Sequence, residues 1–115
     1  MQNNRRTIGS QYEALAAEYL RRQGLIILET NYRSRQGEID LIARDGSYLV
    51  FVEVKFRRDD RKGAPAEAVG IQKQGRIRAA AAYYLYVHRC AETTPCRFDV
   101  VAILGEKLTW IRDAF

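Results

Sequence analysis

The sequence has very little of what most metal and nucleophilic sites require. It contains one histidine, His88, which excludes a histidine-rich zinc centre and makes a Ser-His-Asp triad unexpected. Its two cysteines, Cys90 and Cys96, are separated by five residues, which matches neither a zinc knuckle nor a redox motif. In a cytoplasmic protein we expect two free thiols, with a disulfide between them as the alternative. No glycine-rich segment matches a phosphate-binding loop. The groups left for chemistry are carboxylates, lysine and arginine, which favours a Mg²⁺-type site with oxygen ligands.

Long apolar stretches are also missing. No apolar run approaches the ~20 residues that a membrane-spanning helix needs. The segment from Met1 to Tyr12 is polar and lacks the apolar part of a secretion signal. We therefore expect a cytoplasmic protein with no membrane partner. The 115 residues, of which 47% are hydrophobic, fit a single domain over residues 1–115.

Positive charge is in excess and comes mostly from arginine. Lys and Arg number 19 against 14 for Asp and Glu, which gives a net charge of +5, and fifteen of the 19 are Arg. The planar donor fork of arginine matches phosphate oxygens, so this bias suits a polyanionic partner such as nucleic acid. Many basic domains simply have a solvated basic surface, so charge alone does not identify the partner.

The apolar periodicity along the chain predicts seven elements in the order α-β-β-β-α-β-β. This order indicates an α/β domain with a mixed central β-sheet flanked by helices. The expected elements are a helix from Ile8 to Gly24, strands 25–32, 39–44 and 48–57, a helix from Pro65 to about His88, and strands 98–104 and 107–111.

A hairpin turn at Asp45-Gly46 determines which side chains share a face of the sheet. If Arg44 pairs with Ser47 across the turn, Asp40 and Glu53 become diagonal neighbours on one face, with ~7–8 Å between their backbones. A register shift of two residues would keep this arrangement, whereas a shift of one would destroy it.

Lys55 follows Glu53 by two positions and therefore points to the same face. The strand 48–57 is apolar on both faces, which predicts that both are covered. Carboxylates at the end of such a strand are costly to bury without a cation. This favours an open-ended cleft that holds Mg²⁺ or Mn²⁺ beside Lys55. The alternative is a surface ion-pair cluster on the sheet, and Glu38 is either an additional acid of the site or a cap on its strand.

Both helices can contribute to this cleft. Glu13 projects to the edge of the first helix's apolar stripe, where it either leans towards the cleft or lies solvated on the helix flank. Lys73 projects onto the apolar stripe of the second helix, so it either reaches the cleft or extends along the edge of the core. Further basic residues could contact phosphates or simply be solvated: Arg33, Arg35, Arg57, Arg58 and Arg76.

The acid of one strand followed by Glu-x-Lys on the next, here Asp40 and Glu53-Val54-Lys55, resembles the core of the PD-(D/E)XK nuclease superfamily. The segments Gly-Glu-Ile-Asp-Leu-Ile at 37–42 and Val-Phe-Val-Glu-Val-Lys at 50–55 more closely resemble the YraN family, which is similar to archaeal Holliday-junction resolvases. The resemblance covers most of the chain, because it continues in Glu13, residues 17–24, residues 31–33, and Lys73 with Arg76 before residues 79–85.

This resemblance implies a restriction-endonuclease-like core with Mg²⁺ or Mn²⁺ held by Glu13, Asp40 and Glu53, and with Lys55 at the attacking water. Ile39 stands where the superfamily often has proline, and that position is a structural one. The similarity to junction resolvases implies a homodimer and a DNA partner with branched or single-stranded features.

The sequence therefore predicts a metal-dependent endonuclease that hydrolyses nucleic-acid phosphodiester bonds in DNA repair or recombination. The carbonyl of Val54 is a further candidate metal ligand. Two alternatives remain open. One is a non-catalytic nucleic-acid-binding protein that retains the nuclease-like scaffold, and the other is a small interaction module whose acids form structural ion pairs.

Overall fold

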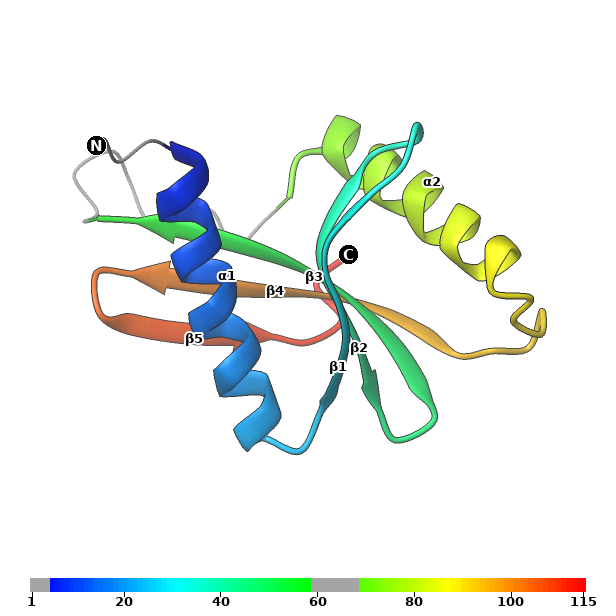
Figure 1. The fold of residues 1–115 in the computed structure, drawn as a ribbon, viewed down its shortest axis with the longest axis horizontal. Coiled ribbons are helices and arrows are strands. Elements are labelled where there is room, and N and C mark those ends of the chain that lie inside the picture. The colour runs from blue at the N-terminus through cyan, green and yellow to red at the C-terminus, as the bar shows by residue number, and fades with distance from the viewer. Residues whose placement is uncertain (1–4, 59–68) are drawn as a thin grey trace.

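The predicted α/β order is confirmed by the computed structural model, which describes residues 5–58 and 69–115 (Figure 1). Arg5 to Ile8 are described only as backbone. The elements are α1 (Arg5–Arg22), β1 (Ile26–Arg33), β2 (Glu38–Asp45), β3 (Tyr48–Arg57), α2 (Ile71–Val87), β4 (Cys96–Leu104) and β5 (Lys107–Ile111).

The five strands form one mixed sheet in the order β1-β2-β3-β4-β5. β3 and β4 are parallel, and the connection between them contains α2, as a parallel pair requires. The other neighbouring strands are antiparallel. The mixed sheet predicted from the sequence is therefore present.

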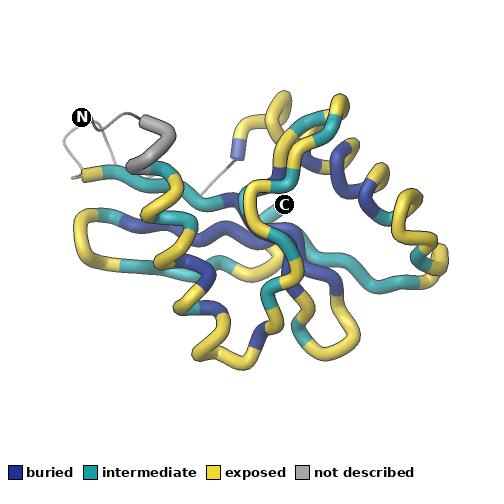
Figure 2. Tube along the Cα trace, in the orientation of Figure 1, coloured by how far each residue is buried: buried dark blue, intermediate teal, exposed yellow. Residues whose placement is uncertain are grey.

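Both faces of the sheet are covered, as the two-sided apolar character of β3 predicts. Val50 and Val52 pack with α1 residues such as Leu20 in one buried cluster. Leu49 and Phe51 pack with residues of α2 in the other. The central strands consequently carry most of the buried positions (Figure 2). Alternate side chains of β3 thus pack into the two buried clusters on opposite faces of the sheet.

The predicted register of the β2–β3 hairpin is wrong by two residues. Asp45, rather than Arg44, is the last paired residue of β2, and it pairs with Tyr48 around a loop of Gly46 and Ser47. Gly46 has a φ of +62°, which glycine adopts without steric cost. The carboxylate of Asp45 accepts a hydrogen bond of 3.0 Å from Arg97 in β4, which accounts for its place in the strand.

The predicted start of the second helix is also wrong. Pro65, where a helix was expected, lies outside the described residues, and Val69 and Gly70 are not helical. α2 begins at Ile71, with Gly70 in an extended conformation as its N-cap. Val69 is instead buried in the cluster on the α2 side of the sheet. Its packing against the core explains why the chain is extended here.

β2 and β3 diverge beyond a common paired segment. Their last recorded pair is Leu41 with Val52, after which β2 continues beside β1 and β3 continues beside β4. Figure 1 shows the two strands separating, with the β1–β2 hairpin rising beside α2. Strict alternation in β2 is interrupted at the same place, because Ile39 and Ile42 both pack on the α2 side. The divergence leaves an opening between the strands.

The buried carboxylate of Asp99 in β4 accepts hydrogen bonds from β5 and from the end of the chain. Asp99 is fully buried and accepts hydrogen bonds of 2.9 to 3.0 Å from the Arg97 guanidinium and the Trp110 indole, and one of 2.9 Å from the backbone N–H of Asp113. All of these donors lie outside the opening between β2 and β3. Asp99 is therefore a structural acid, because its carboxylate oxygens are hydrogen-bonded to groups that hold β4, β5 and the end of the chain together.

None of the described helices is long and apolar enough to cross a membrane. Cys90 and Cys96 are both free and half-buried, as their spacing predicted.

Candidate functional site

Two cavities occupy the opening between β2 and β3 and share three lining residues, Asp40, Glu53 and Lys73. We call these three residues the acid–lysine centre. The first cavity has a volume of about 330 Å³ and is also lined by Gly9, Tyr12, Glu13, Val54 and Phe56. The second has a volume of about 290 Å³ and is also lined by Gly37, Glu38, Arg76 and Ile77.

Asp40 lies in β2 where β2 leaves β3. Continuing the paired register would place it opposite Glu53, but the strands have separated, and its carboxylate accepts a hydrogen bond of 2.7 Å from the backbone N–H of Val54. Burial, followed by the negative charge of Glu53, raises the pKa of Asp40 from 3.8 to about 8, while the Val54 N–H acts in the opposite direction. The site thus holds a carboxyl group whose ionised form is poorly compensated.

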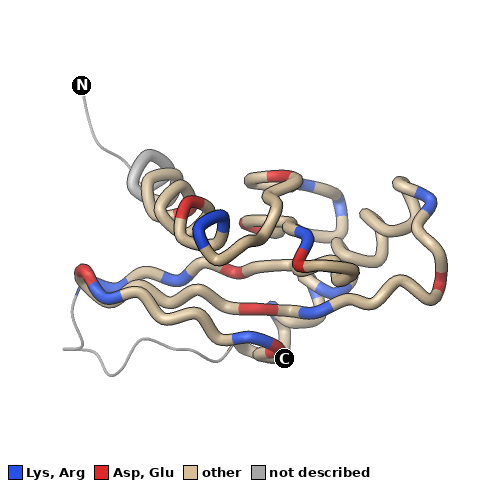
Figure 3. The backbone as a smooth tube through the Cα atoms, turned by 90° about the horizontal axis from the view of Figure 1, so that it is seen from below, with Lys and Arg blue, Asp and Glu red and all other residues tan. Residues whose placement is uncertain are grey.

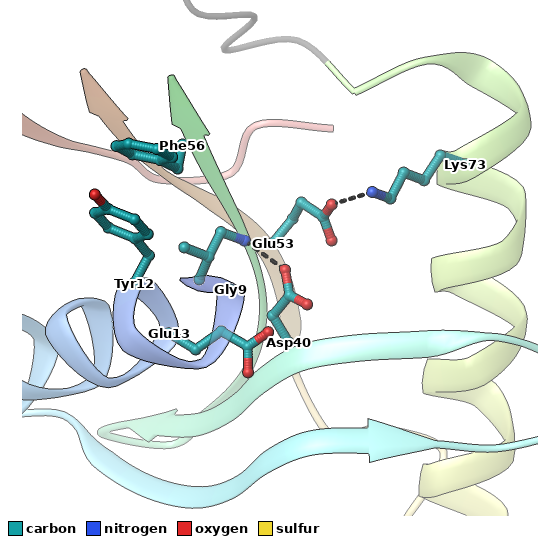
Figure 4. A pocket seen from close by; sticks show the side chains of 8 residues that line it. Gly9, Tyr12, Glu13, Asp40, Glu53, Phe56 and Lys73 are labelled. Atoms are coloured by element: carbon teal, nitrogen blue, oxygen red, sulfur yellow. Dashed lines mark hydrogen bonds and ion pairs between the residues drawn. The ribbon is translucent and has the colours of Figure 1, made fainter. Parts of the chain in front are cut away.

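Glu53 in β3 is almost fully buried, with 5% of its side chain exposed, and it forms an ion pair with Lys73 of α2 (Figure 4). Burial alone would lower the pKa of Lys73, but the hydrogen bond to Glu53 and the charges of the two acids raise it. Of the two possibilities for Lys73, the structure therefore shows the one in which the side chain reaches the cleft. Its ammonium group provides the cation that the buried carboxylate requires.

Glu13 of α1 lines the first cavity, and Figure 4 shows its side chain directed towards Asp40. Burial raises the pKa of Glu13, an effect that its hydrogen bond with Asp40 opposes and that the charge of Glu53 reinforces. The structure thus places Glu13 at the cleft rather than on a solvated flank. Three carboxylates from α1, β2 and β3 converge on one opening.

Lys55 is half-buried in β3, two positions after Glu53. The described residues that line the two cavities do not include it. Burial lowers the pKa of Lys55, and the positive charge of Lys73 adds to this, while Glu53 acts in the opposite direction. Lys55 is thus near enough to the acid–lysine centre for the charges of Glu53 and Lys73 to shift its pKa.

The first cavity is lined by three carboxylates, Glu13, Asp40 and Glu53, and carboxylate oxygens are the ligand type that a hard divalent cation prefers. Among residues 5–58 and 69–115, however, no three ligand-type side chains stand close enough to form a ready-made metal site. Lys73 holds the carboxylate of Glu53 instead. Binding of Mg²⁺ or Mn²⁺ here requires Glu53 to exchange an ammonium partner for the metal.

The basic residues considered for nucleic-acid contacts do not form one group. Arg76 lines the second cavity. Arg33, at the end of β1, is close enough to Glu13 for its positive charge to lower the pKa of that carboxyl group. Arg35 is exposed in the turn between β1 and β2. Arg57 lies at the end of β3, where its carbonyl accepts a hydrogen bond from Gly105, and Arg58 follows it. In the view of Figure 3, Lys and Arg positions are interspersed with Asp and Glu positions over the described part of the chain.

Several lining residues of the cleft were not identified from the sequence, among them Tyr12, Phe56 and Gly37. Tyr12 and Phe56 stack with ring centroids 3.6 Å apart and form one wall of the first cavity. A Cβ atom at Gly37 would lie 2.9 Å from the backbone oxygen of Arg76, so only glycine lets the β1–β2 hairpin approach α2 this closely. The glycine directly before Glu38-Ile39-Asp40 was the available signal for this contact, whereas no local pattern pairs Tyr12 with Phe56.

Residues 12–103 match the family described as "Uncharacterised protein family UPF0102". The chain belongs to the UPF0102 family. A UPF0102 protein of Lachnoclostridium phytofermentans is 54% identical to it, over 97% of this chain and 95% of the relative. UPF0102 proteins of Yersinia pseudotuberculosis and Yersinia pestis are each 48% identical, over 97% of this chain and 97% of the relative.

The UPF0102 match includes every residue of the candidate site named above except Gly9. It begins at residue 12 in α1 and ends at residue 103 in β4, so it includes Glu13, the acid–lysine centre and Arg76. The family assignment confirms the YraN-family resemblance seen in the sequence.

Proposed function

We propose that this UPF0102 protein is a Mg²⁺- or Mn²⁺-dependent nuclease of the PD-(D/E)XK type that hydrolyses phosphodiester bonds of DNA in the cytoplasm, in repair or recombination. The observation that carries the proposal is the convergence of carboxylates from α1, β2 and β3 on one cleft that also receives Lys73. The acids lie at an opening between diverging strands, where a polymer can approach them. A branched or partly single-stranded substrate and a homodimeric protein are part of this proposal.

Asp40, Glu53 and Glu13 would hold the metal, and the carbonyl of Val54 is a further candidate ligand. A bound Mg²⁺ or Mn²⁺ supplies an activated water and neutralises charge on the scissile phosphate. Val54 positions the carboxylate of Asp40 through its N–H, at 2.7 Å. A fixed carboxylate is a better ligand, because less conformational freedom is lost when it binds.

The two lysines have different parts in this proposal. The pKa of Lys55 is lowered mainly by burial, so its protonated form is less favoured than that of an exposed lysine. Lys55 would orient the attacking water or stabilise the negative charge that develops on the phosphate. Lys73 neutralises Glu53 when no metal is bound and, once released from it, can contact a phosphate.

The second candidate is a nucleic-acid-binding protein that keeps the scaffold without turnover. Its support is the Lys73–Glu53 ion pair together with the lack of a closed three-ligand cluster within residues 5–58 and 69–115. In this case Lys73 would be a permanent partner of Glu53. Divalent ions would then leave thermal stability unchanged, whereas a specific metal ligand raises it by mass action.

Cleavage assays on junctions, flaps, single strands and duplexes of DNA, and on RNA, test the proposal. We expect hydrolysis in Mg²⁺ or Mn²⁺ and none in chelator. Asp40→Asn and Glu53→Gln should abolish it, while Glu106→Gln in the exposed turn after β4 should not. Persistent activity in both cleft variants would identify a contaminating nuclease. Salt-dependent DNA binding with no cleavage in any metal would favour the second candidate.

A further inference from the structure

The acid–lysine centre divides the cleft into two lobes of different chemistry. The lobe between α1 and β3, which we call the aromatic lobe, includes the walls formed by Tyr12 and Phe56. The lobe between the β1–β2 hairpin and α2, which we call the arginine lobe, includes Arg76. Their volumes of about 330 and 290 Å³ suit a small molecular unit such as one nucleotide. A double helix, with its paired and stacked bases, is far larger than either lobe.

The aromatic lobe has the character of a base-binding surface. The rings of Tyr12 and Phe56 stack on each other at 3.6 Å with an interplanar angle of 15°, so the pair joins α1 to β3 and offers a base the outer face of a ring (Figure 4). Among the residues that the structure describes, Glu13 is the one charged lining residue of this lobe outside the acid–lysine centre. The carboxylate of Glu13 can accept hydrogen bonds from the N–H groups of a base. Flat aromatic surfaces bind bases of any sequence through stacking.

The arginine lobe is suited to binding a phosphate rather than a base. Arg76 contributes a guanidinium, whose donor fork matches two phosphate oxygens. Gly37 brings the β1–β2 hairpin against the backbone of Arg76 and so fixes the depth of this lobe. Glu38 also lines it, so the lobe suits an anion held by Arg76 at one side rather than a wholly positive groove.

We propose that the cleft selects an unpaired nucleotide, with its base in the aromatic lobe, its phosphate at the acid–lysine centre and the adjoining phosphate at Arg76. The substrate class is therefore a single-stranded or frayed nucleic-acid strand. This inference rests on the proposed function, because it places the scissile phosphate among the acids. A paired base offers no free face to the Tyr12–Phe56 wall and would have to leave its stack, which costs a few kcal/mol.

Binding to short oligonucleotides containing 2-aminopurine tests the inference, with Ca²⁺ as the divalent ion and fluorescence as the readout. We expect the single strand to bind at least about tenfold more tightly than the blunt duplex of the same sequence, and one position to be quenched by stacking. Replacing the base at that position by an abasic site should weaken binding by about tenfold. Equal affinity for the abasic strand, or for the duplex, would overturn the inference.

Two variants with a matched control locate the base. Tyr12→Leu and Phe56→Leu each remove one ring of the wall while keeping an apolar side chain, and both should abolish the quenching. Tyr86→Leu changes an exposed tyrosine of α2, 81% exposed and not a lining residue of either lobe, and should leave it unchanged. Quenching that survives in both wall variants would place the base elsewhere.

The same oligonucleotides separate this inference from the proposed function when cleavage is measured in Mg²⁺. Cleavage that is indifferent to the abasic site and to strand pairing would leave the nuclease proposal standing and overturn the unpaired-nucleotide inference. Base-dependent binding without cleavage in any divalent metal would overturn the nuclease proposal and retain the binding inference.

Discussion

The carboxylate of Asp40 accepts a 2.7 Å hydrogen bond from the backbone N–H of Val54 at the point where β2 and β3 cease to pair. A side chain thus replaces the carbonyl that a continued strand ladder would supply. The exchange satisfies the N–H of Val54 and holds the carboxylate at the mouth of the cleft. The same atom pair therefore ends the ladder and positions the acid.

The stability of the protein should depend on pH through Asp40. Its pKa of about 8 in the fold, against 3.8 ordinarily, means that the folded state retains a proton that the unfolded chain loses. This stabilising contribution is complete below pH ~4, and it is lost as the pH rises towards 8, by at most ~1.4 kcal/mol per pH unit. Asp40→Asn removes it, so the variant should be more stable than the wild type at pH 8 and equal to it near pH 4. Urea unfolding across this range measures the difference.

The control for this prediction is Glu106→Gln, in the exposed turn between β4 and β5, which should unfold like the wild type at every pH. The raised pKa of Glu13 acts in the same direction as that of Asp40, so some pH dependence should remain in Asp40→Asn. An Asp40→Asn protein that is less stable than the wild type at pH 8 would show that the ionised carboxylate is well compensated in the fold.

Removing the ammonium group of Lys73 should destabilise the fold and make its stability depend on divalent ions. Lys73→Met leaves the buried carboxylate of Glu53 without its ion-pair partner. We expect a loss of about 1–3 kcal/mol, below the cost for a fully buried pair because the Lys73 side chain is 49% exposed. Excess Mg²⁺ or Mn²⁺ should restore the thermal midpoint, because a metal can take the position of the ammonium.

Lys107→Met, at an exposed position of β5, is the matched control and should show neither the loss nor the metal-dependent recovery. Lys73→Arg keeps the charge and should stay near the wild type. If divalent ions raise the midpoint of the wild type and of Lys73→Met by the same amount, the ammonium and the metal do not compete for Glu53.

Replacing Gly37 by alanine should force the β1–β2 hairpin away from α2. The added Cβ would lie 2.9 Å from the backbone oxygen of Arg76, and the φ of Gly37 is +157°, which residues with a Cβ rarely adopt. We expect a cost of about 1–3 kcal/mol by chemical denaturation, with weaker nucleic-acid binding because the arginine lobe changes shape.

The matched control for Gly37→Ala is Gly75→Ala in α2, where an added Cβ meets nothing within 4 Å. This change should stabilise the protein by up to about 1 kcal/mol, because alanine is the better helix former. Equal effects of the two substitutions would mean that the hairpin adjusts freely and that its approach to α2 is not steric in origin.

Loss of the buried Asp99 carboxylate should be the most damaging of these substitutions. Asp99→Ala removes the acceptor for Arg97, which is 15% exposed, and for the Trp110 indole. We expect a loss of about 3–5 kcal/mol. Trp110 is the only tryptophan in the sequence, so its fluorescence spectrum should report the change directly. Asp113→Asn keeps the backbone donor at a φ of +53°, which asparagine tolerates, and should be neutral in both measurements.

Local patterns in the sequence were sufficient for the elements and for the two-sided core. The alternation in residues 48–57 predicted a strand covered on both faces, and Val50 and Phe51 do pack in separate clusters. Such patterns succeed because burial follows the period of the backbone, which is a local property. They also predicted that Asp40 and Glu53 share one site, because a register error of two residues preserves the face of every side chain.

The hairpin register, the start of α2 and the side chains that meet in the cleft involve contacts between distant parts of the chain. In the observed register Asp45 binds Arg97, 52 positions later, and Val69, just before α2, packs into the core. Periodicity placed Glu13 at the edge of the apolar stripe of α1 and Lys73 on the apolar stripe of α2. The packing of α1 and α2 on opposite faces of the sheet brought both to the cleft. The chain thus specified its strands, helices and acids locally. Only the tertiary structure decided that Lys73 is the lysine that pairs with Glu53. That contact joins α2 to β3, so it depends on long-range packing rather than on a local pattern.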